Sequence, residues 1–279
     1  PINKLIQGGL GNGDLGLIFG NPGGGKSWTL VAIGGHAVKM GYNVLHYTLE
    51  LSESYTGRRY DAFFSQIPVD NLDKHKKEIE ALTPDLPGEL IIREFPTGKT
   101  TTNALESHIK KVQDLGIKPD LIIIDYIDLL ATKKRNVDRK GEIDDIYTSI
   151  KGLARELDIP IWSVSQVNRA GAKDNIIEGD KAAGSYDKLM ITDFSMSLSR
   201  KKEDKVNGTG RLHIMKNRYG MDGFTFKADV NTSTGNIEVG DEYDGDNEEN
   251  LQPNNNNGYN NFDSLDKKLL QTKFFELNT

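Results

Sequence analysis

Eight residues near the N-terminus follow the spacing G-x-x-x-x-G-K-S, a pattern whose chemistry is phosphate binding. They are Gly20, Asn21, Pro22, Gly23, Gly24, Gly25, Lys26 and Ser27. The glycines let backbone N–H groups curl around a phosphate, Lys26 reaches the β- and γ-phosphates, and the Ser27 hydroxyl ligates Mg²⁺. A glycine-rich turn that merely precedes Lys-Ser is the alternative, but the pattern lies between an expected strand and an expected helix, as the chemistry requires. We therefore expect ATP and Mg²⁺ here, with Trp28 among the nucleotide-binding residues.

Two acidic residues follow apolar runs of the strand type and can serve the same site. Asp125 ends the run L-I-I-I-D, where the carboxyl edge of a parallel sheet is expected, and a carboxylate there orients Mg²⁺ and its water. Glu50 follows the run V-L-H-Y-T-L and can orient or activate water against the γ-phosphate. A solvated strand end is the plainer interpretation of either acid alone, so the phosphate-binding pattern is what favours a chemical role.

Three polar residues near the ends of later strands are further candidates. Gln166, in the run S-V-S-Q-V-N-R, can sense the γ-phosphate and report its loss to the segment that follows. Lys216 and Arg218, in K-N-R-Y-G, are not expected to share the same pocket. Cations there make sense if they serve a neighbouring subunit's nucleotide, as an arginine finger supplied in trans. The alternatives are an exposed glutamine and a surface hairpin with ordinary charges.

The elements that must position these residues alternate along the chain from about residue 5 to residue 240. The expected strands are 15–19, 43–49, 89–93, 120–125, 160–165, 194–199, 210–216 and 224–228. The expected helices are 26–40, 53–64, 102–115 and 142–157. Strand–helix alternation with nearly continuous apolar strands predicts an α/β fold, a mainly parallel sheet with helices on both faces. The last strands follow one another without an expected helix between them, which predicts an antiparallel edge.

Composition divides the 279-residue chain into a neutral body and an acidic tail. The net charge is -6, but nine of the 41 acidic and three of the 35 basic residues lie in 241–279, so residues 1–240 carry 32 of each. We expect a folded nucleotide-binding domain at 1–240, a disordered acidic, asparagine-rich linker at 241–261 and a short amphipathic tail at 262–279 that can bind a partner. The absence of cysteine excludes disulfides and thiol chemistry. Without a long apolar run or a signal peptide, a soluble cytoplasmic protein with no membrane partner is expected.

Together, these motifs resemble the five ordered signatures of the RecA-like motor domain of DnaB-family (superfamily 4) replicative helicases, most closely the versions carried by tailed phages. The resemblance covers residues 5–240 and implies a RecA-like P-loop NTPase core that acts as an ATP-hydrolysing DNA helicase. It implies that Lys26 and Ser27 bind ATP and Mg²⁺, that Glu50 is the catalytic base, and that Asp125 orients the metal. Gln166 would be the sensor, and Lys216 and Arg218 would reach the γ-phosphate of the adjacent subunit.

The same resemblance implies a hexameric ring that threads single-stranded DNA and grips its phosphates with two inward loops, moving from 5′ to 3′. The expected DNA-binding residues are Lys133, Lys134, Arg135, Arg139 and Lys140 in the first loop, and Lys181, Gly184 and Ser185 in the second. Lys181-Ala-Ala-Gly184 stands where the family carries Arg-Glu-Ser-Gly. A solvated basic loop is the alternative for residues 133–140.

Three other expectations remain open at this stage. A RecA/RadA-like recombinase or a KaiC-like ATPase would use the same core, and a protein that only binds nucleotide would share the P-loop. Primase, a helicase loader or a single-strand-binding protein is the expected partner of the tail. The family's N-terminal primase-binding domain has no counterpart in these residues, so we expect a fragment, an excised domain or a reduced motor.

Overall fold

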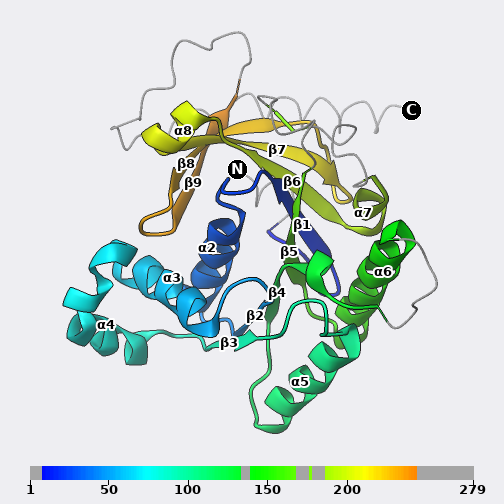
Figure 1. The fold of residues 1–279 in the computed structure, drawn as a ribbon, viewed down its shortest axis with the longest axis horizontal. Helices are drawn as coiled ribbons and strands as arrows, with labels where there is room; N and C mark the ends of the chain where they lie inside the picture. The colour runs from blue at the N-terminus through cyan, green and yellow to red at the C-terminus, as the bar shows by residue number, and fades with distance from the viewer. Residues whose placement is uncertain (1–7, 133–138, 168–175, 178–185, 244–279) are drawn as a thin grey trace, which may run out of the picture.

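A single mixed sheet organises the computed structural model, which describes residues 8–132, 139–167, 176–177 and 186–243. In these ranges the sheet has nine strands in the order β3-β2-β4-β5-β1-β6-β7-β8-β9 (Figure 1). The strands are β1 (Leu15–Gly20), β2 (Val44–Thr48), β3 (Leu90–Glu94), β4 (Leu121–Asp125), β5 (Ile161–Gln166), β6 (Phe194–Ser199), β7 (Thr209–Asn217), β8 (Thr225–Asn231) and β9 (Asn236–Glu242). Strands β1 to β6 pair in parallel, and β6 to β9 pair antiparallel, as the strand pattern predicts.

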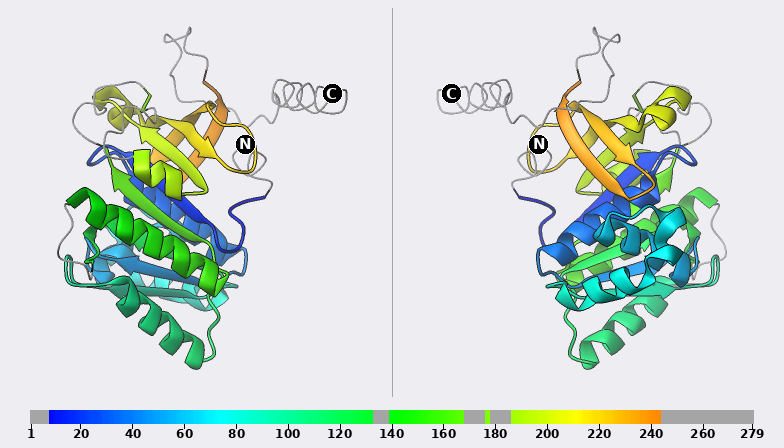
Figure 2. Two further views of the ribbon diagram at one scale, coloured as in Figure 1. Left: turned by 90° about the vertical axis from the view of Figure 1, so that its right-hand side faces the viewer. Right: turned by 90° about the vertical axis from the view of Figure 1, so that its left-hand side faces the viewer.

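Helices cover both faces of the parallel part of the sheet. The two views of Figure 2 show α5 and α6 on one face and α2, α3 and α4 on the other. The helices are α2 (Lys26–Lys39), α3 (Glu53–Ser65), α4 (Lys76–Leu82), α5 (Thr102–Asp114), α6 (Arg139–Leu157), α7 (Tyr186–Ile191) and α8 (Lys202–Asn207), with 3₁₀ turns η1 (Val69–Lys74), η2 (Thr83–Asp85) and η3 (Ile127–Leu129). The predicted α/β class with a mainly parallel sheet is confirmed.

The alternation of side chains along β1 explains why the sheet has a hydrophobic core on each face. Leu15, Leu17 and Phe19 of β1 point into the core formed with α5 and α6, whereas Ile18 points into the core formed with α2. Successive side chains of a strand face opposite sides, so a strand covered on both sides is apolar throughout. All six residues of β1 are buried. The strand that carries the phosphate-binding loop is therefore covered along its whole length.

The antiparallel edge differs from the prediction in two respects. Helix α8 lies between β6 and β7, so the expectation that no helix separates the last strands is wrong. Strand β9 is missing from the predicted strands, because it is a half-exposed edge strand and its polar residues give no strong alternation. It runs to Glu242, past the boundary expected at residue 240. The rest of the predicted linker and tail, from residue 244 on, lies outside the described residues.

Within the described ranges, none of the helices combines the length and apolar character needed to span a membrane.

Candidate nucleotide-binding site

The carboxyl ends of four adjacent parallel strands form one edge of the sheet, and the predicted residues meet there. The order β2-β4-β5-β1 places Thr48 beside Asp125 and Gln166 beside Gly20. The Leu49 N–H donates to the Asp125 carbonyl at 2.8 Å, which ties the chain leading to Glu50 to the end of β4. Residues far apart in the sequence thus converge because parallel strands end at the same edge.

The loop after β1 has the geometry of an anion cradle. Gly25 has φ 101°, a left-handed conformation that strains any residue with a side chain, and it is the N-cap of α2. The Gly24 N–H donates to the Asn21 carbonyl at 3.0 Å and closes the turn. No side chain caps α2 and no acidic residue lies in its first turn. Its positive N-terminal end is therefore available to a phosphate.

Lys26 is held inside this loop. Its side chain is buried, with 8% of the residue exposed, and its Nζ donates to the Gly20 and Asn21 carbonyls at 2.9 Å each. Burial lowers the pKa of Lys26 to about 8, while the charges of Asp125 and Glu50 oppose this effect. The ammonium is thus poorly solvated, and its hydrogen bonds go to carbonyls, so an anion entering the loop gains a strong attraction.

Asp125 lies directly behind the loop, with 2% of the residue exposed. The Ser27 hydroxyl donates a hydrogen bond to its carboxylate, and Asp125 Oδ1 has no hydrogen-bond partner among the described residues. Burial raises the pKa of Asp125 to about 6, and the Ser27 hydrogen bond opposes the rise. A buried carboxylate with a free oxygen is costly unless a cation or a donor reaches it. This arrangement suits a metal ion placed between Ser27 and Asp125.

The loop opens into a cavity of about 320 Å³. The predicted residues that line it are Pro22, Gly23, Gly24, Gly25, Lys26, Ser27, Trp28, Glu50 and Gln166. Gly20 and Asn21 contribute the carbonyls that hold Lys26, and Asp125 sits beneath Ser27. The structure thus brings all of the predicted P-loop and strand-end residues into one place.

Arg59 of α3 also lines the cavity and is not among the predicted residues. Its guanidinium lies 4.9 Å from the centre of the Trp28 ring and 5.5 Å from that of Tyr55. Burial lowers the pKa of Arg59, with Asp125 the largest opposing charge, and its Nε is buried without a hydrogen-bond partner among the described residues. The sequence gives no signal for this position, because only the packing of α3 against α2 turns Arg59 toward the loop.

Tyr126 and Thr232 also belong to the unpredicted part of the lining. The Gln166 Nε2 donates to the Tyr126 hydroxyl at 3.4 Å, so the end of β5 contacts the end of β4 inside the cavity. Thr232 comes from the turn between β8 and β9, at the far side of the sheet. The cavity therefore joins the parallel strands and the antiparallel edge.

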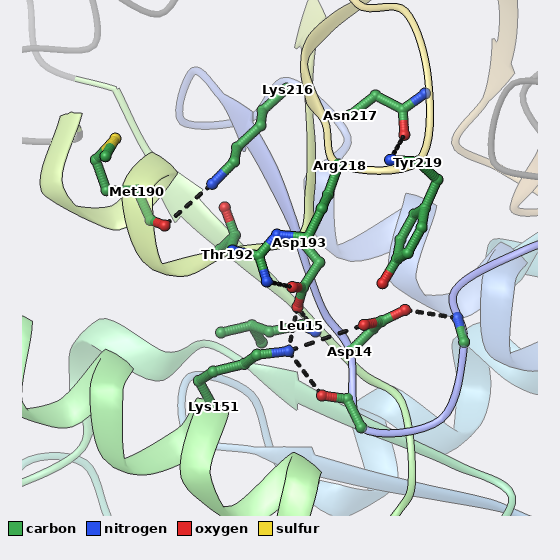
Figure 3. Close-up of polar contacts among 12 residues, drawn as sticks. Asp14, Leu15, Lys151, Met190, Thr192, Asp193, Lys216, Asn217, Arg218 and Tyr219 are labelled. Atoms are coloured by element: carbon green, nitrogen blue, oxygen red, sulfur yellow. Dashed lines mark hydrogen bonds and ion pairs between the residues drawn. The ribbon is translucent and has the colours of Figure 1, made fainter.

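Lys216 and Arg218 lie at the opposite edge of the sheet from the cavity, because β7 runs antiparallel to β6. Figure 3 shows the surroundings of both side chains. Lys216 donates to the Met190 carbonyl at 3.0 Å, and Arg218 pairs with Asp193 at 2.7 Å. Burial and the neighbouring Arg218 lower the pKa of Lys216. The Arg218 side chain remains 46% exposed, so it can meet a second molecule. Neither cation can reach the cavity of its own chain.

Most predicted DNA-binding residues fall outside the described part of the chain. These are Lys133, Lys134, Arg135, Lys181, Gly184 and Ser185. Arg139 is the first residue of α6, and Lys140 forms an ion pair with Asp187 of α7 at 2.8 Å. The described ends of the two predicted loops thus lie next to each other.

Comparison with known proteins gives a consistent result. The family described as the DnaB-like helicase C terminal domain matches residues 2–227. A DnaB-like replicative helicase of Enterobacteria phage T4 is 23% identical over 235 residues, which are 78% of this chain and 49% of that protein. The chain thus spans about half the length of this relative, and 19% of a replicative DNA helicase DnaB from Nostoc.

Two solved structures share the fold. One, described as an ATPase domain, superimposes with a TM-score of 0.72 at 18% identity, covering 85% of this chain and 87% of that one. A DnaB-like replicative helicase, described with its interactions with primase, superimposes with a TM-score of 0.73 at 18% identity, covering 85% of this chain and 59% of that one. The expected RecA-like arrangement of strands is confirmed by these likenesses.

Proposed function

Because the chain belongs to the DnaB-like helicase C terminal domain family, we propose that it is the ATP-hydrolysing motor of a replicative DNA helicase. The observation that carries the proposal is the cavity at the carboxyl edge, where a phosphate-binding loop meets Glu50 and Gln166. A recombinase or a KaiC-like ATPase shares the core, but the family match does not favour either.

ATP binds with its phosphates in the loop between β1 and α2. The N–H groups at the start of α2 donate to the phosphate oxygens, and Lys26 exchanges its carbonyl partners for the β- and γ-phosphates. Its desolvated ammonium supports this role, since the attraction to an anion grows where water is scarce. Arg59 and Trp28 line the same cavity and would contact the nucleotide outside its phosphates.

Ser27 and Asp125 are the residues that would hold Mg²⁺. The buried Asp125 Oδ1, which has no partner among the described residues, and the adjacent Ser27 hydroxyl are oxygen donors of the kind that this ion prefers. When bound, Mg²⁺ neutralises charge that develops on the β- and γ-phosphates. The Asp125 carboxylate, hydrogen-bonded by the Ser27 hydroxyl, would orient the ion.

Glu50 acts as the general base for the attacking water, and Gln166 senses the γ-phosphate. Both side chains line the same cavity as Lys26, and Glu50 is exposed to solvent from which a water can be drawn. The hydrogen bond from Gln166 to Tyr126 gives the sensor a partner when no γ-phosphate is present. Loss of the γ-phosphate after hydrolysis would return Gln166 to this partner.

Lys216 and Arg218 complete the site of a neighbouring subunit. Their position at the far edge of the sheet supports a ring in which each subunit offers these cations to the next nucleotide, and a hexamer is the arrangement we propose. Single-stranded DNA passes through the ring and is held by its phosphates, through the predicted loop residues, with 5′ to 3′ movement. Primase, a loader or a single-strand-binding protein is the proposed partner, with residues 262–279 as the docking segment.

The proposal is tested by ATP hydrolysis of the full chain with and without single-stranded DNA. Hydrolysis stimulated by DNA is expected, and Glu50→Gln is expected to abolish it while ATP binding, measured with a fluorescent analogue, persists. Glu53→Gln, at a partly exposed acid in the first turn of α3, is the matched control and should hydrolyse ATP like the wild type. Hydrolysis that survives Glu50→Gln would overturn the assigned base.

A further inference from the structure

Helix α7 is a short element whose two halves contact two different parts of the sheet. Lys188 in its first half points toward the ends of β4 and β5. The carbonyls of Leu189 and Met190 in its second half accept hydrogen bonds from Lys216 at the opposite edge. Six residues thus link the edge that carries the nucleotide cavity to the edge that carries the two predicted trans-acting cations. Figure 3 shows the contact between Met190 and Lys216.

Lys188 is the centre of a buried polar cluster. With 5% of the residue exposed, its Nζ donates to Asp128 Oδ2 at 2.7 Å and to the Ser165 hydroxyl at 2.8 Å. The Ser165 hydroxyl donates in turn to Asp128 Oδ2 at 2.9 Å, and the Tyr147 hydroxyl donates to Asp128 Oδ1 at 2.7 Å. The Lys188 ammonium also lies 5.1 Å from the centre of the Tyr147 ring. Both carboxylate oxygens of Asp128 therefore have partners, which hold the ion pair in place.

This cluster is attached directly to the wall of the nucleotide cavity. Ser165 immediately precedes Gln166, and Asp128 follows Tyr126 after one intervening residue. Gln166 and Tyr126 line the cavity and are hydrogen-bonded to each other. A change in the hydrogen bonds of Gln166 therefore occurs next to Ser165, a partner of Lys188.

The second half of α7 and the turn after it hold Lys216 and Arg218. Asp193, which follows α7, pairs through Oδ1 with the Arg218 guanidinium at 2.7 Å, and its carbonyl accepts the Arg218 N–H at 3.0 Å. Asp193 Oδ2 is bound by Lys151 and accepts the Leu15 N–H at 2.8 Å, so its charge stays compensated when Arg218 moves to another anion (Figure 3). The backbone and the side chain of Arg218 are thus both set by a residue just after α7.

The geometry points to Lys188 as a positioning residue for Lys216 and Arg218. Through α7, Lys188 sets the position of these two cations according to the nucleotide that is bound in the cavity of its own subunit. The inference rests on the proposed function, because it needs the two cations to act on a neighbouring nucleotide. A buried ion pair cannot separate without leaving an uncompensated charge, so α7 follows its Asp128 and Ser165 partners rather than detaching from them. A displacement of about 1 Å at a catalytic cation lowers a rate by about 100-fold.

The first test is the rate of DNA-stimulated ATP hydrolysis by variants of the full chain. Lys188→Met is expected to lower kcat by about 100-fold with little change in KM, and Lys188→Arg, which keeps the charge, should restore most of it. The double variant Lys188→Met with Asp128→Asn removes both charges and so leaves no charge of this pair uncompensated. It should stay as slow as Lys188→Met, and recovery of the wild-type rate would overturn the inference. Lys110→Met, at an exposed lysine of an ion pair on α5, is the matched control and should not change the rate.

The second test mixes subunits with different defects. Glu50→Gln subunits cannot hydrolyse ATP but offer intact cations to the next subunit, whereas Lys188→Met subunits have an intact cavity and misplaced cations. A one-to-one mixture should therefore hydrolyse ATP faster than the sum of the two parents. Arg218→Ala mixed with Glu50→Gln is the reference for the proposed function itself.

The outcomes separate the two proposals. Recovery in both mixtures supports the role of Lys188. Recovery with Arg218→Ala but not with Lys188→Met overturns the inference and leaves the proposed function standing, because Lys188 would then serve its own cavity. Recovery in neither mixture overturns action across the subunit interface, and the inference with it.

Discussion

Asparagine in place of Asp125 is expected to make the nucleotide-free protein more stable while it removes ATP hydrolysis. The carboxylate is buried, with 2% of the residue exposed, and burial raises its pKa to about 6 from the ordinary value of 3.8. The charged form is therefore disfavoured in the folded chain. A difference of about 2 between the folded and unfolded pKa corresponds to about 3 kcal/mol above pH 7. The asparagine side chain would keep the shape of the aspartate, including an oxygen that accepts from Ser27, without the charge.

The pH dependence follows from the sign of the pKa difference. Because the folded pKa of Asp125 is raised, its stabilising contribution is complete below about pH 4, falls as pH rises from about 4 to about 6, and is lost above the folded pKa. The Asp125→Asn variant has no such titration. Its advantage in free energy of unfolding should be about 3 kcal/mol at pH 8 and about half of that at pH 5.

Urea unfolding of both proteins at pH 5 and pH 8, without nucleotide or Mg²⁺, measures this advantage. The same variant should lose hydrolysis and the stabilisation that Mg²⁺ with ATP gives the wild type, since the metal would be held by the carboxylate. Asp120→Asn, at an exposed residue before β4, is the control for the effect on stability of removing one negative charge from the chain. An Asp125→Asn protein no more stable than the wild type at pH 8, or an advantage that does not change with pH, would refute the account of a carboxylate destabilised by burial.

Three further predictions concern the loop and its surroundings. Burial lowers the pKa of Lys26 to about 8, so ATP affinity should stay constant up to about pH 8 and then fall about tenfold per pH unit. Titration with a fluorescent nucleotide from about pH 7 to about pH 9.5 measures this affinity. An affinity that does not change with pH would contradict the role of the ammonium. Gly25→Ala should lose nucleotide binding and about 1 to 2 kcal/mol of stability in urea, whereas Gly116→Ala, which also has a positive φ but lies in open space, should lose stability alone. Arg59→Met should weaken ATP binding by about 10- to 100-fold through loss of a charged hydrogen bond, with unchanged affinity contradicting its place in the site.

The sequence predicts the parts of the site that depend on local pattern. The loop before α2, Glu50, Asp125 and Gln166 each follow or end a recognisable strand, and parallel strands end at one edge, so their meeting can be worked out without coordinates. The predicted helices 26–40, 53–64, 102–115 and 142–157 lie close to α2, α3, α5 and α6, because each has a clear apolar face or start signal.

The remaining parts depend on tertiary packing. Arg59 and Thr232 reach the cavity only because α3 and the β8–β9 turn pack beside the loop, and nothing in their neighbours along the chain marks them. Lys188 has no role predicted from the sequence, and it is buried against Asp128 because α7 packs on α6 and the end of β5. Buried charges of this kind are invisible to hydrophobic periodicity, which treats every lysine as exposed.

Unwinding of a forked DNA duplex by the full chain tests the central claim most directly. Two substrates are compared, one with a single-stranded 5′ tail and one with a single-stranded 3′ tail on the strand to be encircled. Separation of the strands is followed with ATP and Mg²⁺. The account predicts ATP-dependent unwinding of the fork with the 5′ tail, lost in Lys26→Ala and in Arg218→Ala. ATP hydrolysis with no strand separation on either fork would contradict a helicase motor, and unwinding that persists in Arg218→Ala would contradict a site completed by the neighbouring subunit.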